Sequence, residues 1–328
     1  MNNLLFHWYE NPDECLILIE PIFSKILTEM IKKRYGFNKN ISKNLNINSK
    51  FYYQLKKNKP IRIKTLKRII NKLKLNYNKV NRHILGIGGS KFTFPINFPV
   101  NLNNVDISIL IAAFMSDGHN ESQHPHYANM GFLGNKIIQS ARIIIKDIPY
   151  EFRNEHVRFH PILGRILLKL GVPYGCKSVI NPDVPRFIYS KKEWMRQYLT
   201  QVFDDEGHAA TKISRKIVFG RSVTVKNVPK EFSKFMELKK KVYFNNLPPK
   251  IKEIVLETPQ RLLVSEKKML NLFGINSSLR CRGICKYIKR TSADWVIEIS
   301  GKENIRKFHN NIGFSHPEKV RKMEFYLE

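Results

Sequence analysis

Two stretches of this 328-residue chain share one apolar pattern, and each ends in an acid, a glycine and a histidine. The first runs from Leu110 to His119 and the second from Leu199 to His208. A leucine, a phenylalanine, the acid, the glycine and the histidine match at five aligned positions, and the two acids lie 89 residues apart. An internal repeat of this size predicts a duplicated structural unit.

Each stretch predicts an apolar helix that ends at its acid, Asp117 or Glu206. The glycine that follows is the residue favoured just after a helix C-terminus. An acid is unfavourable there because the helix dipole is already negative at that end. Its occurrence in both helices indicates function. If the helices pack side by side, the two carboxylates meet and attract a divalent cation.

A second pair of similar segments surrounds two glycines, Gly171 and Gly274. A basic residue stands six positions after each glycine, namely Lys177 and Arg280. We therefore expect these two residues to occupy equivalent positions in the duplicated unit.

The charge of the chain predicts a polyanionic partner. Lys and Arg number 57 against 27 Asp and Glu, which gives a net charge of +30 and a pI of about 10.0. The longest apolar runs fall short of the roughly 18 to 20 residues that a membrane span needs. The acidic start, MNNLLFHWYENPDE, lacks the basic region of an export signal. We expect a cytoplasmic monomer that binds nucleic acid and no membrane.

More than half of the excess charge lies between Ile22 and Lys91, with nineteen Lys or Arg against one acid, Glu29. Apolar spacing there predicts four short helices, around Phe23–Met30, Ile41–Leu45, Phe51–Leu55 and Ile63–Leu73. We predict a small all-α domain over residues 1–91. Glycines and prolines between Gly86 and Asn104 predict a linker, which ends the domain at 91 and covers residues 92–104.

The segment Ile41–Leu73 resembles the helix-turn-helix of phage-repressor type. The resemblance rests on the turn Leu45-Asn46-Ile47, the cap Asn48-Ser49 and Pro60-Ile61 before the last helix. It implies that the third helix enters the major groove of DNA, with Phe51 and Leu55 facing inward. The side chains it would present to DNA are Ser49, Lys50, Tyr52, Tyr53, Lys56 and Lys57. A basic helical bundle with solvated lysines is the alternative.

The repeated motifs, Leu110–Gly118 and Leu199–Gly207, resemble those of the single-chain LAGLIDADG homing endonucleases. The resemblance implies an α+β fold of two pseudo-symmetric αββαββα repeats, residues 105–190 and 191–328, whose sheets form a saddle over DNA. Local patterning agrees with such a fold: strands are predicted at Lys212–Val225 and Trp295–Ile299, and helices at Lys136–Ile145, Phe232–Tyr243 and Ser265–Phe273.

The same resemblance implies site-specific, Mg²⁺-dependent cleavage of double-stranded DNA. Asp117 and Glu206, with Gly118 and Gly207, would hold the metal, and Lys177 and Arg280 would be the basic groups near the scissile phosphate. The sequence leaves the role of His119 and His208 open. No other cofactor is expected.

Two residues of the second motif depart from the family pattern. Gln201 is bulky where the helices usually approach through small residues, and Asp205 adds a third carboxylate beside Glu206. These departures keep two alternatives open: a domesticated regulator that binds DNA without cutting it, and a splicing cofactor (maturase) that binds structured intron RNA. The presence of both acids favours the nuclease.

Overall fold

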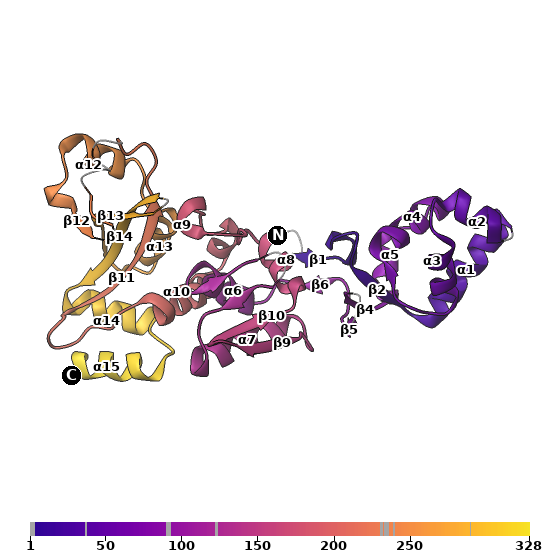
Figure 1. The fold of residues 1–328 in the computed structure, drawn as a ribbon. Helices are drawn as coiled ribbons and strands as arrows, with labels where there is room; N and C mark the ends of the chain where they lie inside the picture. Colours follow the sequence, from indigo (N-terminus) through magenta and orange to yellow (C-terminus); the bar gives the residue numbers. More distant parts are fainter. Residues whose placement is uncertain are drawn as a thin grey trace. The chain divides into compact units, whose positions relative to one another are not determined.

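The computed structural model describes the chain except residues 1–3, 37, 90–92, 122–123, 230–231, 233–235, 239 and 289. The chain divides into two compact units (Figure 1). Unit 1 comprises Met1–Asn104 and Ala141–Pro149, and unit 2 comprises Val105–Ser140 and Tyr150–Glu328.

The basic block of unit 1 forms helices at the predicted places. They are α1 (Pro21–Tyr35), α2 (Asn38–Leu45), α3 (Ser49–Lys56), α4 (Ile63–Leu73) and a short α5 (Tyr77–Val80). Gly36 ends α1 with a φ of 73°. The buried face of α1 carries Leu27 and Ile31, whereas Ile26 is 44% exposed. The predicted helix is confirmed.

Unit 1 also contains strands, so the predicted all-α domain is wrong. The sheet order is β3-β2-β4-β5, formed by Ile61–Arg62, Leu16–Ile19, Ile84–Gly88 and Thr93–Pro95. A separate pair joins β1 (Leu5–Phe6) to β6 (Val100–Asn101). The short apolar runs of β2 and β4 satisfy their backbone groups by pairing with each other.

The stretch expected to be a linker therefore contains β5 and β6. Gly86 belongs to a strand, where a Cβ atom would lie only 2.8 Å from the carbonyl oxygen of Phe94 on the neighbouring strand. Glycine is needed here for close approach of two backbones, not for a flexible connection.

The first half of unit 2 has the element order αββαββα, followed by a short helix. The elements are α6 (Asp106–Met115), β7 (Gly118–His119), β8 (His126–Tyr127), α7 (Gly131–Ile144), β9 (Tyr150–Arg153), β10 (His156–Phe159), α8 (Pro161–Lys169) and α9 (Lys177–Ile180). The antiparallel sheet has the order β7-β8-β10-β9.

The second half begins with the second motif helix and has longer strands. The elements are α10 (Lys192–Glu206), β11 (Lys216–Thr224), β12 (Lys241–Tyr243), α12 (Pro249–Leu256), α13 (Arg261–Leu272), β13 (Ser278–Tyr287), β14 (Arg290–Ser300), α14 (Lys302–Asn311) and α15 (Pro317–Leu327). The sheet order is β11-β14-β13-β12, which differs from the first half. The protein is thus α+β with several small antiparallel sheets.

Most of the predicted elements of unit 2 lie within observed ones. The predicted strands overlap β11 and β14, and the predicted helices at Lys136–Ile145 and Ser265–Phe273 overlap α7 and α13. The helix predicted for Phe232–Tyr243 is wrong at its end, because Lys241–Tyr243 pairs with β13 as β12. Much of the rest of that segment lies outside the described residues.

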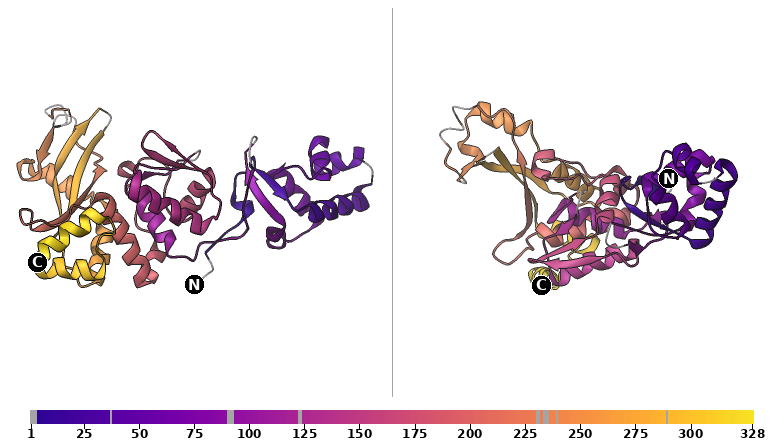
Figure 2. Two further views of the ribbon diagram at one scale, coloured as in Figure 1. Left: turned by 90° about the horizontal axis from the view of Figure 1, so that it is seen from below. Right: turned by 45° about the vertical axis from the view of Figure 1, so that its right-hand side comes forward.

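The two motif helices, α6 and α10, pack against each other in the core of unit 2 (Figures 1 and 2). Every residue of α6 from Ile107 to Met115 is buried. On α10 the ring of Phe203 meets the edges of Phe219 and Phe308, each with a centroid distance of 4.6 Å. In the described part of the chain no helix has the length and apolar character of a membrane span.

Candidate active site

The glycine after each acid closes its motif helix by close approach. A Cβ on Gly118 would lie 2.9 Å from the carbonyl oxygen of Ala113, and one on Gly207 would lie 2.6 Å from that of Phe203. Gly207 has a φ of −78°, so left-handed backbone is not the reason for glycine at this position. In both halves the chain turns back against the last helical turn, which fixes the acid at the helix end.

Asp117 and Glu206 come together at the same end of the helix pair. Each carboxylate acts electrostatically on the Lys177 ammonium group, and Asp117 also acts on Glu206. The Asp117 side chain is half-buried, and its Oδ2 accepts a hydrogen bond of 3.0 Å from the Asn129 amide. The structure therefore places the two predicted acids in one electrostatic cluster.

Asp205 is a third acid in this cluster. Its Oδ1 accepts hydrogen bonds from the Tyr127 hydroxyl and, at 2.8 Å, from the Gln201 amide. Burial raises the pKa of Asp205 well above its usual range, and the negative charges of Asp117 and Glu206 act in the same direction. The two departures from the family pattern, Gln201 and Asp205, thus contact each other inside the site.

Arg221 on β11 was not predicted and is the central cation of the cluster. Its Nε lies 2.7 Å from Glu206 Oε2, although the two atoms are not aligned as a hydrogen bond. Its Nη1 donates to Glu266 at 2.5 Å and its Nη2 donates to the Ser116 hydroxyl at 3.0 Å. The Arg221 side chain is only 7% exposed. It therefore joins both motif helices to α13 through buried contacts.

Burial and the neighbouring charges shift the pKa values of Glu206, Glu266 and Arg221. Burial raises the pKa of Glu206, with Arg221 opposing the change. Burial likewise raises the pKa of Glu266 to about 7, although it contacts Arg221. Burial alone would lower the pKa of Arg221, but the carboxylates of Glu206 and Glu266 outweigh it and raise that pKa. Arg221 stays charged at all physiological pH values.

Two lysines bind the carbonyl ends of the motif helices. Lys177 Nζ donates to three carbonyl oxygens after or within the last turn of α6, those of Phe114, Ser116 and Gly118. Lys319 Nζ donates to two carbonyl oxygens of α10, those of Phe203 and Asp204, at 3.0 and 2.5 Å. Burial lowers the pKa of Lys177 to about 8 and also lowers that of Lys319, while the nearby acids oppose both changes.

Asp204 holds the segment that carries Lys319. Its side chain is fully buried and accepts hydrogen bonds from the backbone N–H groups of Ser315 and His316, at 2.8 and 3.0 Å. It also pairs with Lys136 at 3.1 Å. A buried, multiply bonded carboxylate of this kind fixes the start of α15, and with it the position of Lys319.

Lys319 is therefore the structural equivalent of Lys177 in the second half of unit 2. The prediction that Arg280 occupies this equivalent position is wrong. Arg280 lies on β13 and pairs at 2.6 Å with Glu298, which also pairs with Lys216 at 3.2 Å. The signal for Lys319 is present in the sequence, because it stands six residues after Gly313 as Lys177 stands six after Gly171. Both glycines have positive φ, 67° and 98°.

The oxygen donors of the cluster suit a hard divalent cation. Asp205 Oδ2 is buried and has no hydrogen-bond partner among the described residues, a state that buried acceptors rarely show. The predicted ligand Gly118 offers a carbonyl oxygen that already accepts from Lys177; for Gly207 the structure gives a backbone N–H bond to Phe203. In the described chain no cluster of three or more His, Cys, Asp or Glu side chains is arranged to hold a metal. Mg²⁺ would use fewer carboxylates together with water and phosphate oxygens.

The two motif histidines have other partners. His119 Nε2 lies 3.4 Å from Glu121 Oε1, and its ring lies 5.3 Å from that of His126. His208 forms a backbone bridge with Val218, and its side chain is exposed. Neither set of contacts involves the two acids.

The predicted DNA-binding helix, α3, lies in unit 1 with its basic face exposed. Asn48 caps it by accepting from the Lys50 N–H at 2.9 Å, and Asn46 has a φ of 50°, which confirms the predicted cap and turn. The exposed side chains are Ser49, Lys50, Tyr53, Lys56 and Lys57. Tyr52 is only 5% exposed, so its predicted contact with DNA is wrong.

The inward face of α3 is defined by Tyr52 and Leu55, three residues apart on the same side of the helix. Phe51, predicted to face inward, is half-buried with the Arg62 guanidinium 5.7 Å from its ring. The exposed surface still combines Lys57 with Tyr53, at 5.8 Å from ammonium to ring centroid.

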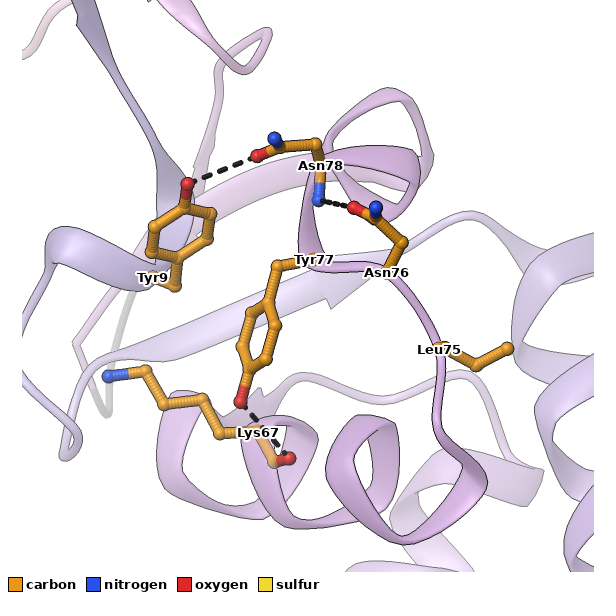
Figure 3. A pocket seen from close by; sticks show the side chains of 6 residues that line it. All are labelled: Tyr9, Lys67, Leu75, Asn76, Tyr77 and Asn78. Carbon is orange, nitrogen blue, oxygen red and sulfur yellow. Dashed lines mark hydrogen bonds between the residues drawn. The ribbon is translucent and has the colours of Figure 1, made fainter.

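A surface pocket of about 580 Å³ also lies in unit 1 (Figure 3). It is lined by Tyr9, Lys67, Leu75, Asn76, Tyr77 and Asn78. Its polar groups already bond within the protein: Tyr9 donates to Asn78 at 3.1 Å and Lys67 pairs with Asp13 at 2.8 Å. The hydrogen bond between Tyr9 and Asn78 therefore joins the amino-terminal segment to α5.

The chain matches no protein-family model and no curated protein.

Proposed function

We propose that this protein is a metal-dependent DNA endonuclease of the LAGLIDADG homing type. One observation carries the proposal: the packing of α6 against α10 brings Asp117 and Glu206 together with two lysines at matched positions. Two repeated acids at the negative ends of helices cost stability unless a cation uses them. The resemblance assigns these acids to Mg²⁺, and the orphaned Asp205 oxygen supports an oxygen-bound cation in the cluster.

When bound, Mg²⁺ activates water and neutralises the charge on a leaving oxygen in phosphodiester hydrolysis. The lysines have separate roles. All three N–H groups of Lys177 donate to carbonyl oxygens, so it fixes the end of α6. Lys319 donates to two carbonyls, and the bonds of the described residues leave its third N–H for a phosphate oxygen.

DNA binding is assigned to α3 together with the sheets of unit 2. Lys50, Lys56 and Lys57 would bind phosphates, and Tyr53 is exposed for contact with a base edge or the sugar backbone. The recognised site would then extend from the cleavage site to a second contact made by unit 1. A saddle formed by the two sheets belongs to this proposal.

A second candidate is a DNA-binding regulator that does not cut. The observation that favours it is the ion pair between Glu206 and Arg221, because a carboxylate held by a buried guanidinium is less available to a metal. Such a regulator would bind DNA through the same surface but would not cleave it.

Both candidates are tested by incubation with a randomised duplex library in Mg²⁺, followed by sequencing of cut ends and of bound, uncut duplexes. The nuclease yields cut ends at one sequence, and Asp117→Asn, as the matched control, yields none. The regulator yields enriched duplexes without cut ends. If folded intron RNA displaces all enriched DNA in direct competition, the protein is a splicing cofactor instead.

A further inference from the structure

Two tyrosine rings from distant parts of the sequence line the open pocket of unit 1 (Figure 3). Tyr9 belongs to the amino-terminal segment and Tyr77 begins α5, and their rings meet edge to face at a centroid distance of 5.3 Å. Both side chains are half-buried. The pocket volume of about 580 Å³ lies within the range of about 300 to 1,000 Å³ that is typical of small-molecule sites. The pocket therefore offers aromatic surface in a space of ligand size.

Both rings are held in place by residues that do not line the pocket. The fully buried Trp8 stacks on Tyr77 at 5.6 Å, and the Tyr77 hydroxyl donates to the Asn71 side chain at 2.9 Å. The ring of His7 stacks on Tyr9 at 4.9 Å. A ligand that stacks on fixed rings loses little affinity to ordering of the protein. The two tyrosines therefore form a preorganised stacking surface.

Two asparagine amides supply hydrogen-bond donors beside the rings. Asn78 Oδ1 accepts from the Tyr9 hydroxyl at 3.1 Å, and Asn76 Oδ1 accepts from the Asn78 N–H at 2.8 Å. The side-chain oxygen of each asparagine is thus occupied, while the described residues offer no acceptor to either NH₂ group. Carbonyl oxygens at the edges of nucleobases, such as those of thymine, accept bonds from amide groups of this kind.

Lys67 on α4 adds a positive charge to the pocket. Its ammonium group pairs with Asp13 at 2.8 Å, which occupies one of its three N–H groups. The pair is partly exposed, with 28% of the Lys67 side chain and 49% of the Asp13 side chain accessible, so it holds the ammonium only weakly. The surrounding block from Ile22 to Lys91 has nineteen basic residues against one acid. The pocket therefore favours an anionic ligand.

We propose that this pocket binds one unpaired nucleotide, with its base stacked on Tyr9 and Tyr77 and its phosphate at Lys67. A nucleotide combines a flat ring, acceptors at the ring edge and a negative charge, which are the three features that the lining residues match. A free nucleoside monophosphate and an unpaired residue of a nucleic-acid strand present this same chemistry. The site lies in unit 1 and does not depend on cleavage by unit 2.

The test measures binding of the full chain to two labelled single strands by fluorescence anisotropy. One is a short oligothymidylate, and the other is an abasic strand of the same length. Because both carry the same phosphates, the difference in affinity measures the contribution of the bases. The unmodified chain should bind the oligothymidylate about tenfold more tightly, as expected for a base stacked on an aromatic ring.

Tyr77→Leu should remove this preference, whereas Tyr77→Phe, which keeps the ring, should retain it within twofold. Tyr35→Leu is the matched control, because Tyr35 is a half-buried tyrosine of unit 1 that does not line the pocket. It should also retain the preference. Circular dichroism melting shows whether each variant is folded.

A competition experiment distinguishes the two sources of the nucleotide. Displacement of the labelled strand by thymidine monophosphate identifies a free nucleotide as sufficient, and displacement by unlabelled oligothymidylate alone identifies an unpaired residue of a strand. Lys67→Met should weaken the oligothymidylate and leave Tyr77 in place, so it tests the pocket even if Tyr77→Leu does not fold. The comparison is made with Lys322→Met, a lysine of unit 2 that pairs with Glu318.

Equal binding of the two strands by the unmodified chain would overturn the inference. So would a preference for bases that survives in folded Tyr77→Leu, or one that Tyr35→Leu loses to the same extent. An oligothymidylate affinity that Lys67→Met and Lys322→Met reduce equally would remove Lys67 from the site.

Discussion

Lys177 and Lys319 occupy matching positions at the two motif helices, where each ammonium group donates to backbone carbonyls at the C-terminal end of its helix. A cation at this end compensates the negative pole of the dipole. Both helices also carry an acid there, so the lysines reduce the repulsion that would otherwise separate α6 from α10.

Replacing Lys177 by Met should lower the free energy of unfolding by about 1 to 3 kcal/mol, because buried carbonyl oxygens lose their donors. Urea denaturation measures the change. Lys322→Met is the control, because Lys322 is half-exposed and pairs with Glu318 on the helix surface; it should change stability by less than about 1 kcal/mol. Equal losses in the two variants would show that Lys177 is merely a surface residue.

A methyl group at either motif glycine should also destabilise unit 2. Gly118→Ala and Gly207→Ala each place a Cβ against backbone atoms that cannot move away, at 2.9 and 2.6 Å. We expect losses of about 1 to 3 kcal/mol from this overpacking. Gly89→Ala is the control, because no atom of the described residues lies within 4 Å of its Cβ position. Thermal unfolding that is unchanged in Gly207→Ala would contradict the close approach.

The raised pKa of Glu266 predicts that the stability of the folded chain depends on pH. Its pKa rises from 4.5 to about 7 in the folded chain, so between these values the folded state binds more protons than the unfolded state. Stability should therefore fall as pH rises from 4.5 to 7, by about 3 kcal/mol from this group. Glu266→Gln should reduce the slope, while Asp205 and Glu206, whose pKa values are also raised, retain part of it. Urea titrations at pH 5 and pH 7.5 measure it, and an unchanged slope in the variant would contradict the assignment.

The sequence predicted elements with strong periodicity better than it predicted faces and partners. The helix at Ile63–Leu73 was found because five apolar residues repeat along it at helical spacing. The strands β2 and β4 were missed because an isolated apolar run of four or five residues has no period that separates strand from helix. Phe51 and Tyr52 are both aromatic, so only packing against the rest of unit 1 decides that Tyr52 is the buried one.

The site shows the same limit. Asp117 and Glu206 were found from a repeat that lies within single segments. The spacing of six residues from Gly313 identifies Lys319. The similar segments around Gly171 and Gly274 favour Arg280 instead. Arg221 had none, because its role depends on β11 passing both helix ends, a relationship between segments that spacing along the chain does not encode.

The exposed face of α3 should control DNA affinity. Lys56→Ala and Lys57→Ala together should reduce the slope of log affinity against log salt by about 2, because each lysine releases roughly one counterion. Tyr53→Ala should weaken binding, whereas Tyr52→Phe, which removes only a buried hydroxyl, should not. Fluorescence anisotropy at several salt concentrations decides this. If the double substitution leaves the slope unchanged, DNA binding belongs to another surface.

The most direct measurement compares the unmodified chain with Asp117→Asn on a duplex selected from the library, with cleavage and affinity measured in the same Mg²⁺ buffer. Asp117 repels phosphate until a cation neutralises it, so removing its charge should abolish cutting and leave affinity equal or slightly higher. Cleavage that persists in Asp117→Asn, or an unmodified chain that binds its duplex and never cuts it, would contradict the nuclease account.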